Sequence, residues 1–365
     1  MKTTVENQAK KQVPLVRVAQ GRNDKESLGH EGRLGPNDKV FYTRTADSWA
    51  RACATGGAAV WAIVAVLARL RIARIGAIEL LFLFGPLVVV PLGMELGRTL
   101  GPKGRQEGWA GWVQPFGALL AIAALWLPPG RAGGFLALGW MFVCVLMAGD
   151  GIAGVVRASW LDAGGGARAT FPSRFTLIAL RVAQIDLAVG GAWFVASRFG
   201  MRPMGIQEPI GLLTAVHFHL AGFATATIAA ATVAFAEKHG IYQWLKPVVL
   251  MVVGMPFVVA AGFVISPALK MGAGVLFAAS VAGLAIALRG CGRLAENSSA
   301  RLFLQIAAAA VFAGMVLAGG YAVADFTGSD VLTIPQMART HGILNAFGFC
   351  LLGLLGWLVE RGRES

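Results

Sequence analysis

Residues 75–97 read IGAIELLFLFGPLVVVPLGMELG, an apolar run whose only charged residues are Glu79 and Glu95. A helix of about 20 apolar residues, rising about 1.5 Å per residue, crosses a bilayer hydrocarbon core of about 30 Å. The run is long enough and apolar enough for that. It therefore predicts a transmembrane helix.

Similar runs recur along most of the chain. Hydrophobic residues make up 56% of the sequence and charged residues only 14%, with a mean hydropathy of +0.65. A soluble domain carries about a quarter charged residues, so an ordinary solvated surface is excluded. We predict an all-α polytopic transmembrane bundle of about ten spans, at residues 52–70, 75–97, 109–127, 133–156, 175–197, 209–235, 246–267, 272–290, 302–324 and 341–359.

The excess of basic over acidic residues is also consistent with a membrane protein. The chain has 32 Lys and Arg against 19 Asp and Glu, a formal charge of +13. In membrane proteins Lys and Arg concentrate in cytoplasmic loops, and their distribution here places both termini in the cytoplasm. No basic stripe is interleaved with aromatic residues, so nucleic-acid binding is not expected.

Two regions differ in polarity. Residues 1–50 are polar with mixed charges and are expected to form a disordered cytoplasmic tail, and residues 51–361 to form the transmembrane domain. The scattered cysteines form no CxxC pair, which disfavours a disulfide framework. They are Cys53, Cys144, Cys291 and Cys350.

Ionisable side chains inside membrane spans are costly and commonly functional. We selected such groups, and one amide that shares a helix face with a histidine, as candidates for substrate or proton binding. They are Glu79, Arg181, Asp186, His217, His219, His341 and Asn345. Arg181 and Asp186 are five residues apart and should not share a face.

The second, sixth and tenth spans all start on the predicted outer side, so Glu79, one of His217 and His219, and His341 could reach one level there. Residues two apart on an α-helix differ by about 200° around the axis, so His217 and His219 should point to nearly opposite sides. A metal site would then combine one of them with His341 and Glu79, a set suited to zinc or iron.

Two prolines interrupt the second span. Pro86 and Pro91 remove backbone donors and should bend the helix while leaving carbonyl groups without their helical partners. Such interruptions are common in carriers and also occur in inert bundles.

Three segments resemble one known family. They are Ile78–Leu81 with Gly85-Pro86-Leu87-Val88 and Pro91-Leu92, the segment Thr214–Phe223, and Met337–Gly342 continuing through Asn345 to Phe349. Together they resemble the YndJ-like family of bacterial integral membrane proteins. The resemblance implies a multi-pass protein of the bacterial inner membrane, and family members are often labelled transporters. It also covers Glu79 and the three membrane histidines.

Three functions remain open from the sequence. The first is a transporter or permease that binds a small molecule or ion and relays protons through histidine, which titrates near neutral pH. The second is a membrane-embedded enzyme that uses zinc, iron or haem on a lipophilic substrate. The third is a non-catalytic assembly or sensing protein. No phosphate-binding GxxxxGK[ST] loop or soluble ATPase domain is present, and the lipid bilayer is the one partner that composition implies.

Overall fold

The computed structural model describes residues 36–101, 109–163, 173–329 and 331–362, with the side chains of 36–48 and 157–163 excepted. These residues form helices and connecting turns, and no strand occurs among them. Ten helices are long and apolar enough to cross a membrane, as predicted. They are Trp49–Arg69, Ala77–Leu100, Trp109–Trp126, Arg131–Val156, Arg174–Phe199, Ile210–Lys238, Leu245–Ile265, Pro267–Leu294, Ser298–Thr327 and Ile334–Arg361.

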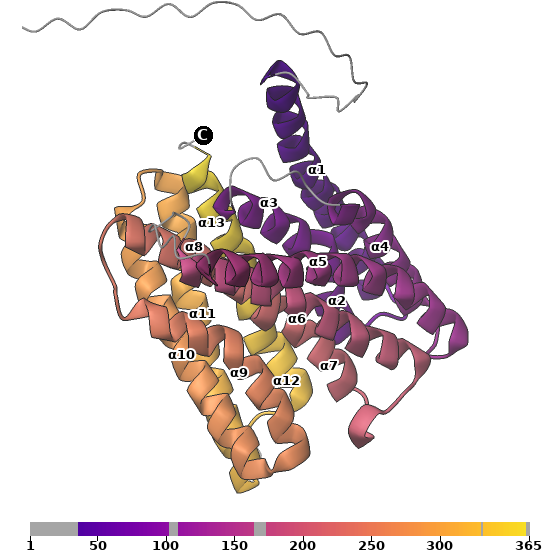
Figure 1. Ribbon diagram of the computed structural model, residues 1–365. Helices are drawn as coiled ribbons and strands as arrows, with labels where there is room; N and C mark the ends of the chain where they lie inside the picture. The colour runs from indigo at the N-terminus through magenta and orange to yellow at the C-terminus, as the bar shows by residue number, and fades with distance from the viewer. Residues whose placement is uncertain (1–35, 102–108, 164–172, 330, 363–365) are drawn as a thin grey trace, which may run out of the picture. The chain divides into compact units, whose positions relative to one another are not determined.

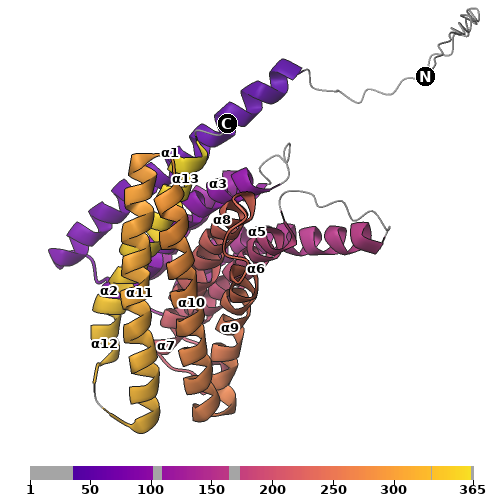
Figure 2. The ribbon, with the colours of Figure 1, turned by 90° about the vertical axis from the view of Figure 1, so that its left-hand side faces the viewer.

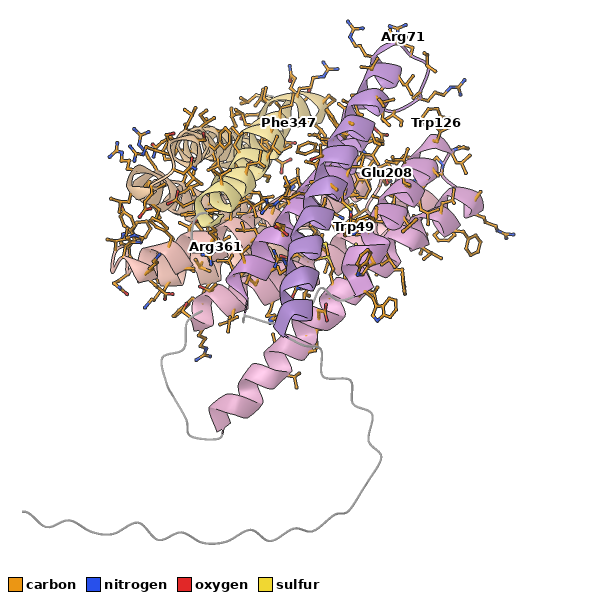
Figure 3. The ribbon with its side chains drawn as sticks, turned by 90° about the horizontal axis from the view of Figure 1, so that it is seen from above. Trp49, Arg71, Trp126, Glu208, Phe347 and Arg361 are labelled. Carbon is orange, nitrogen blue, oxygen red and sulfur yellow. The ribbon has the colours of Figure 1, made fainter. Side chains whose placement is uncertain are left out.

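The chain divides into two units, Met1–Phe41 and Tyr42–Ser365, and the second holds all ten spans. Helix α1 (Pro36–Arg69) begins well before residue 51, where the membrane domain was expected to start. Residues 1–35 of the predicted tail lie outside the described residues. The part of α1 that is long enough to span runs from Trp49 to Arg69, and Arg71 lies in the turn just after it (Figure 3).

Within the second unit, neighbouring spans pack as long antiparallel pairs. Helices α9 (Leu245–Ile265), α10 (Pro267–Leu294) and α11 (Ser298–Thr327) run side by side (Figures 1 and 2). Helix α5 (Arg131–Ala163) packs between α4 (Trp109–Trp126) and α6 (Arg174–Phe199). The sixth span lies at the centre of the bundle, because 94% of its most apolar window is buried.

Three spans are interrupted by π-helical segments. In the second span, η1 (Gly85–Val89) separates α2 (Ala77–Phe84) from α3 (Val90–Leu100). In the sixth, η3 (Phe218–Ala224) separates α7 (Ile210–His217) from α8 (Thr225–Lys238). In the tenth, α12 (Ile334–Met337) leads into η4 (Ala338–Gly342) and η5 (Leu344–Leu351) before α13 (Leu352–Arg361).

The segments η1, η3 and η5 contact one another, so the three interruptions meet inside the bundle. The second, sixth and tenth spans therefore converge at these segments. A π turn carries one residue more than an α turn and is frequently found at functional sites. The contact of η1, η3 and η5 is called the π junction below.

The prolines explain the first interruption. The Val90 N–H bonds to the Gly85 carbonyl, five residues back, and Pro91 has no N–H to offer the next carbonyl. The Pro86 carbonyl is left without a helical partner, and the buried Gln114 of α4 supplies one, with Nε2 at 2.6 Å. The bond ties α4 to the π junction.

Helix α1 approaches the same segment through a glycine. Gly57 lies so close to the Leu87 carbonyl that any side chain at this position would overlap the oxygen. In an α-helix the N–H of residue 91 would bond to the Leu87 carbonyl, but Pro91 has no N–H. A second tie is the Trp61 indole N–H, which donates to the Leu80 carbonyl at 2.8 Å.

The tenth span starts seven residues earlier than predicted, at Ile334 instead of 341. Thr333 and Gln336 form a capping box, in which the Thr333 side chain accepts from the Gln336 N–H. This signal was present in the sequence and was missed. The span then runs past Phe347 to Arg361 (Figure 3), where the Arg361 guanidinium donates to the Thr99 carbonyl at 2.9 Å.

Candidate functional site

His219, in η3, is fully buried, and both of its ring nitrogens have partners. Nδ1 lies 2.8 Å from the Ala215 carbonyl, which can only accept, so Nδ1 carries the proton. Nε2 accepts a hydrogen bond of 2.8 Å from the Trp140 indole N–H of α5. A neutral imidazole satisfied in this way holds two helices together and has no lone pair left for a ligand.

Two glycines make room for this ring. A Cβ at Gly85 of η1 would lie 3.2 Å from the His219 Cβ, and one at Gly190 of α6 would lie 2.7 Å from Nδ1. Phe82 of α2 packs edge-on against the imidazole. His219 therefore joins the second, fourth, fifth and sixth spans, and we read its role as structural.

Asp186 is the second fully buried candidate, and its surroundings are different. Neither carboxyl oxygen has a hydrogen-bond partner among the described residues. The side chain abuts Gly222 of η3, where a Cβ would come within 2.9 Å of its Oδ2. Asp186 lies 12 residues from Arg174 and 13 from Phe199, so it sits at the middle of its span.

His217 and His341 lie at matching depth, each seven residues after the start of its span at Ile210 and Ile334. This is about 10 Å of helix rise. The two side chains are close enough for their charges to interact. The His217 ring is exposed, whereas the His219 ring is buried against α5 and α6, so the two rings face different surroundings.

Each ring of this pair is held through Nδ1. In His217 it bonds to the Leu213 carbonyl of the same helix at 3.0 Å. In the half-buried His341 it bonds to the Gly314 carbonyl of α11 at 2.8 Å. Since carbonyls only accept, Nδ1 carries the proton in both rings, and Nε2 carries the lone pair.

Asn345 lies on the same helix face as His341, as predicted. Its amide nitrogen donates to the His341 carbonyl at 2.8 Å and lies 3.3 Å from Nε2 of the ring. A Cβ at Gly314 would come within 2.9 Å of this amide, so the glycine lets the pair dock on α11. The pair is thus positioned by the tenth span and α11 together.

Glu79 lies in the first turn of the second span. Its carboxylate accepts from the Gly76 N–H at 3.1 Å and caps α2. It lies within electrostatic reach of the buried Arg198, as does Glu208. The Arg198 guanidinium also donates to the Leu127 carbonyl at 2.7 Å. These contacts place Glu79 in a charged cluster where spans two, five and six begin or end.

Arg181 faces away from Asp186, as the five-residue spacing predicted. Its guanidinium packs against Gly154 of α5, and Nη1 donates to the Gln184 side chain at 3.3 Å. Asp186 instead faces η3. The two residues therefore act on different helix interfaces.

The predicted metal ligands do not converge. Among the residues that the structure describes, no three His, Cys, Asp or Glu side chains are grouped so that they could hold a metal ion. In His219 both nitrogens are already engaged, and Glu79 caps a helix. We assign no metal site of three or more protein ligands among these residues.

Sequence reasoning missed three residues that shape this region. Trp140 was unremarked because an indole in an apolar span gives no sign of its partner. Arg198 follows directly after the predicted fifth span, at 175–197, and its position gave no sign that it is buried. Gln114, an amide inside an apolar span, could have been flagged as a group that needs a partner.

The fold and this site define a multi-pass α-helical membrane protein whose second, sixth and tenth spans are interrupted by π-helical segments that meet inside the bundle. The chain belongs to the YndJ-like protein family, whose model matches residues 80–349. It is 33% identical over 187 residues to "Uncharacterized membrane protein YndJ" of Bacillus subtilis (strain 168). That match covers 49% of this chain but only 32% of the relative. No solved structure matches the chain.

Proposed function

We propose that this protein is a transporter or permease of the bacterial inner membrane, with both termini in the cytoplasm. The observation that carries the proposal is the π junction, where three spans with interrupted backbone hydrogen bonding meet inside the bundle. Transporters commonly bind substrates and coupling ions near the bilayer midplane at helices of this discontinuous kind. π segments can also change their hydrogen-bond register locally, which suits a moving element.

The candidate groups divide between two roles in this proposal. His217 and His341, with Asn345, contribute polar groups at one level near the predicted outer side, and they are the groups we assign to a small polar or ionic substrate. Each imidazole keeps Nε2 as the nitrogen that can accept a proton or a hydrogen bond. Asp186 lies deeper, at midspan, against the π junction.

A native cysteine offers the test. Cys350 of η5 is buried, and its thiol lies 3.8 Å from the Leu220 carbonyl of η3, so it sits inside the π junction. Cys291 of α10 is equally buried but lies outside these segments. Two variants would each retain one of these thiols and replace the other three cysteines by alanine. Both would be treated with a membrane-impermeant thiol reagent in right-side-out and inverted vesicles.

For a carrier with alternating access we expect Cys350 to react from both faces and Cys291 from neither. Labelling of Cys350 from one face only would contradict transport and favour an enzyme or receptor with a one-sided site. No labelling of Cys350 from either face would favour a static assembly protein. Retained folding of both variants, checked by monodisperse elution in detergent, makes the comparison valid.

A further inference from the structure

Among the residues that the structure describes, the carboxyl of Asp186 has no hydrogen-bond partner. Its two oxygens are buried and lack partners among the described residues, and the residue is 0% exposed. An ionised carboxylate in such a place is very costly, so the group either carries a proton or meets a cation. Packing alone does not account for an acid at this position.

The described ionisable groups on the elements packed around α6 do not supply such a partner. Those nearest the middle of the span are His219, which faces Gly190 one turn from Asp186, and Cys144 of α5, which faces Gly191. Other ionisable groups on these elements include Arg181, turned towards α5; Asp150 of α5; the exposed His217 of α7; and Lys246 of α9, paired with Glu237 of α8. Arg174 and Arg198 of α6, Arg131 of α5 and Lys238 of α8 lie at or next to helix ends. His219 is a neutral ring with both nitrogens engaged, so it neither donates to the carboxyl nor balances its charge.

The contact itself argues against a metal cation. Hard cations such as Ca²⁺ take about six to eight oxygen ligands. The backbone of Gly222 faces the Asp186 side chain. A Cβ at Gly222 would lie only 2.9 Å from the Cβ, Cγ and Oδ2 atoms of Asp186. This contact leaves no space for an ion between the two helices. A proton needs neither the ligands nor the space.

We infer that Asp186 is a proton-binding site that exchanges its proton with water when the contact between α6 and η3 opens. In that step the carboxyl O–H bond breaks, the proton passes to water, and the carboxylate remains until a proton returns. The step makes Asp186 the coupling group of the transporter, and to that extent the inference rests on the proposed function. The π register of η3 supplies the element that can shift, because Gly222 lies within it.

Infrared spectroscopy of the full-length protein in lipid tests the site without knowledge of the substrate. A protonated carboxyl has a C=O stretching band distinct from those of carboxylates and amides. We expect such a band at neutral pH that shifts in D2O, declines at alkaline pH, and loses the intensity of one carboxyl per chain in D186N. Asp150→Asn, on α5, is the matched control and should keep the band. Labelling the wild-type protein with ¹³C-aspartate assigns the band to aspartate without any variant.

Two results would overturn the inference. Absence of a protonated-aspartate band at neutral pH would mean that Asp186 is ionised. A band that neither shifts in D2O nor responds to pH would mean a sealed acid that exchanges no proton. Either result combined with two-sided labelling of Cys350 would remove the proton site and leave the transport proposal intact. If the infrared band showed that Asp186 exchanges its proton with water, but Cys350 reacted from neither face, the result would contradict the transport proposal and leave the proton site intact.

Discussion

The Trp140 indole N–H donates a hydrogen bond of 2.8 Å to Nε2 of His219, across 79 residues of sequence. The bond joins the fourth span to the central sixth span, and the opposite nitrogen of the same ring bonds the Ala215 carbonyl. One imidazole thereby fixes the packing of α5 against the π-helical segment η3. Because both ring nitrogens of His219 are engaged in hydrogen bonds within the protein, we assign this residue a structural role and not that of a ligand.

Trp140→Phe should therefore destabilise the protein. The change removes the donor, leaves Nε2 buried without a partner, and opens a small cavity, together costing about 2–4 kcal/mol. Unfolding in mixed detergent micelles measures the loss. The control is Trp126→Phe, since Trp126 is 49% exposed, and it should change stability by less than about 0.5 kcal/mol. Equal effects of the two changes would contradict the role of the bond.

Gln114→Leu should show the cost of the orphaned carbonyl. The replacement leaves the Pro86 oxygen buried without its donor, and we expect a loss of about 1–3 kcal/mol in the same unfolding measurement. Gln305→Leu provides a matched comparison, because Gln305 donates to the Arg289 carbonyl at 2.7 Å in an exposed position. Water can replace that donor, so its loss should be smaller. A Gln305 effect as large as that of Gln114 would argue against an orphaned carbonyl in η1.

Adjacent glycines on α1 should respond in opposite ways to alanine. Gly57→Ala places a methyl group onto the Leu87 carbonyl, and overpacking of this kind costs about 1–3 kcal/mol or displaces the helix. Gly56→Ala meets nothing within 4 Å and should be neutral or stabilising by up to about 1 kcal/mol through helix propensity. Thermal unfolding in detergent, with aggregation as the readout, measures the stability of both variants. Equal stability of the two variants would mean that α1 does not pack on η1 at Gly57.

Elemental analysis and an absorption spectrum of the purified protein address the enzyme alternative. We expect zinc, iron and haem below stoichiometric levels, because the predicted ligands are engaged elsewhere or separated. The double variant His217→Ala/His341→Ala should leave the readings unchanged. A stoichiometric metal in the wild-type protein that disappears in this variant would show a metal centre and place an enzyme ahead of a transporter.

The candidate site was predictable only in part. The predicted spans put His217 eight residues into its helix and His341 at the first residue of its own, and only the start of the tenth span at Ile334 gives the two residues the same depth. That His217 and His219 should face different sides followed from helical geometry. The same reasoning could not separate the roles of Asp186 and His219, which are equally buried. Their difference lies in partners on other helices: His219 has two, and Asp186 has none among the described residues.

The sequence by itself determined the ten spans, because insertion of a helix depends on the summed transfer free energy of about 20 consecutive residues. It also determined where backbone bonding fails, since Pro91 lacks an N–H wherever the helix is placed. Only the tertiary structure decided that Gln114 compensates for Pro86, that Trp140 meets His219, and that the three π segments converge. Ten spans of similar hydropathy do not select their neighbours by apolarity, so close contacts at small residues and individual polar pairs between distant positions make that choice.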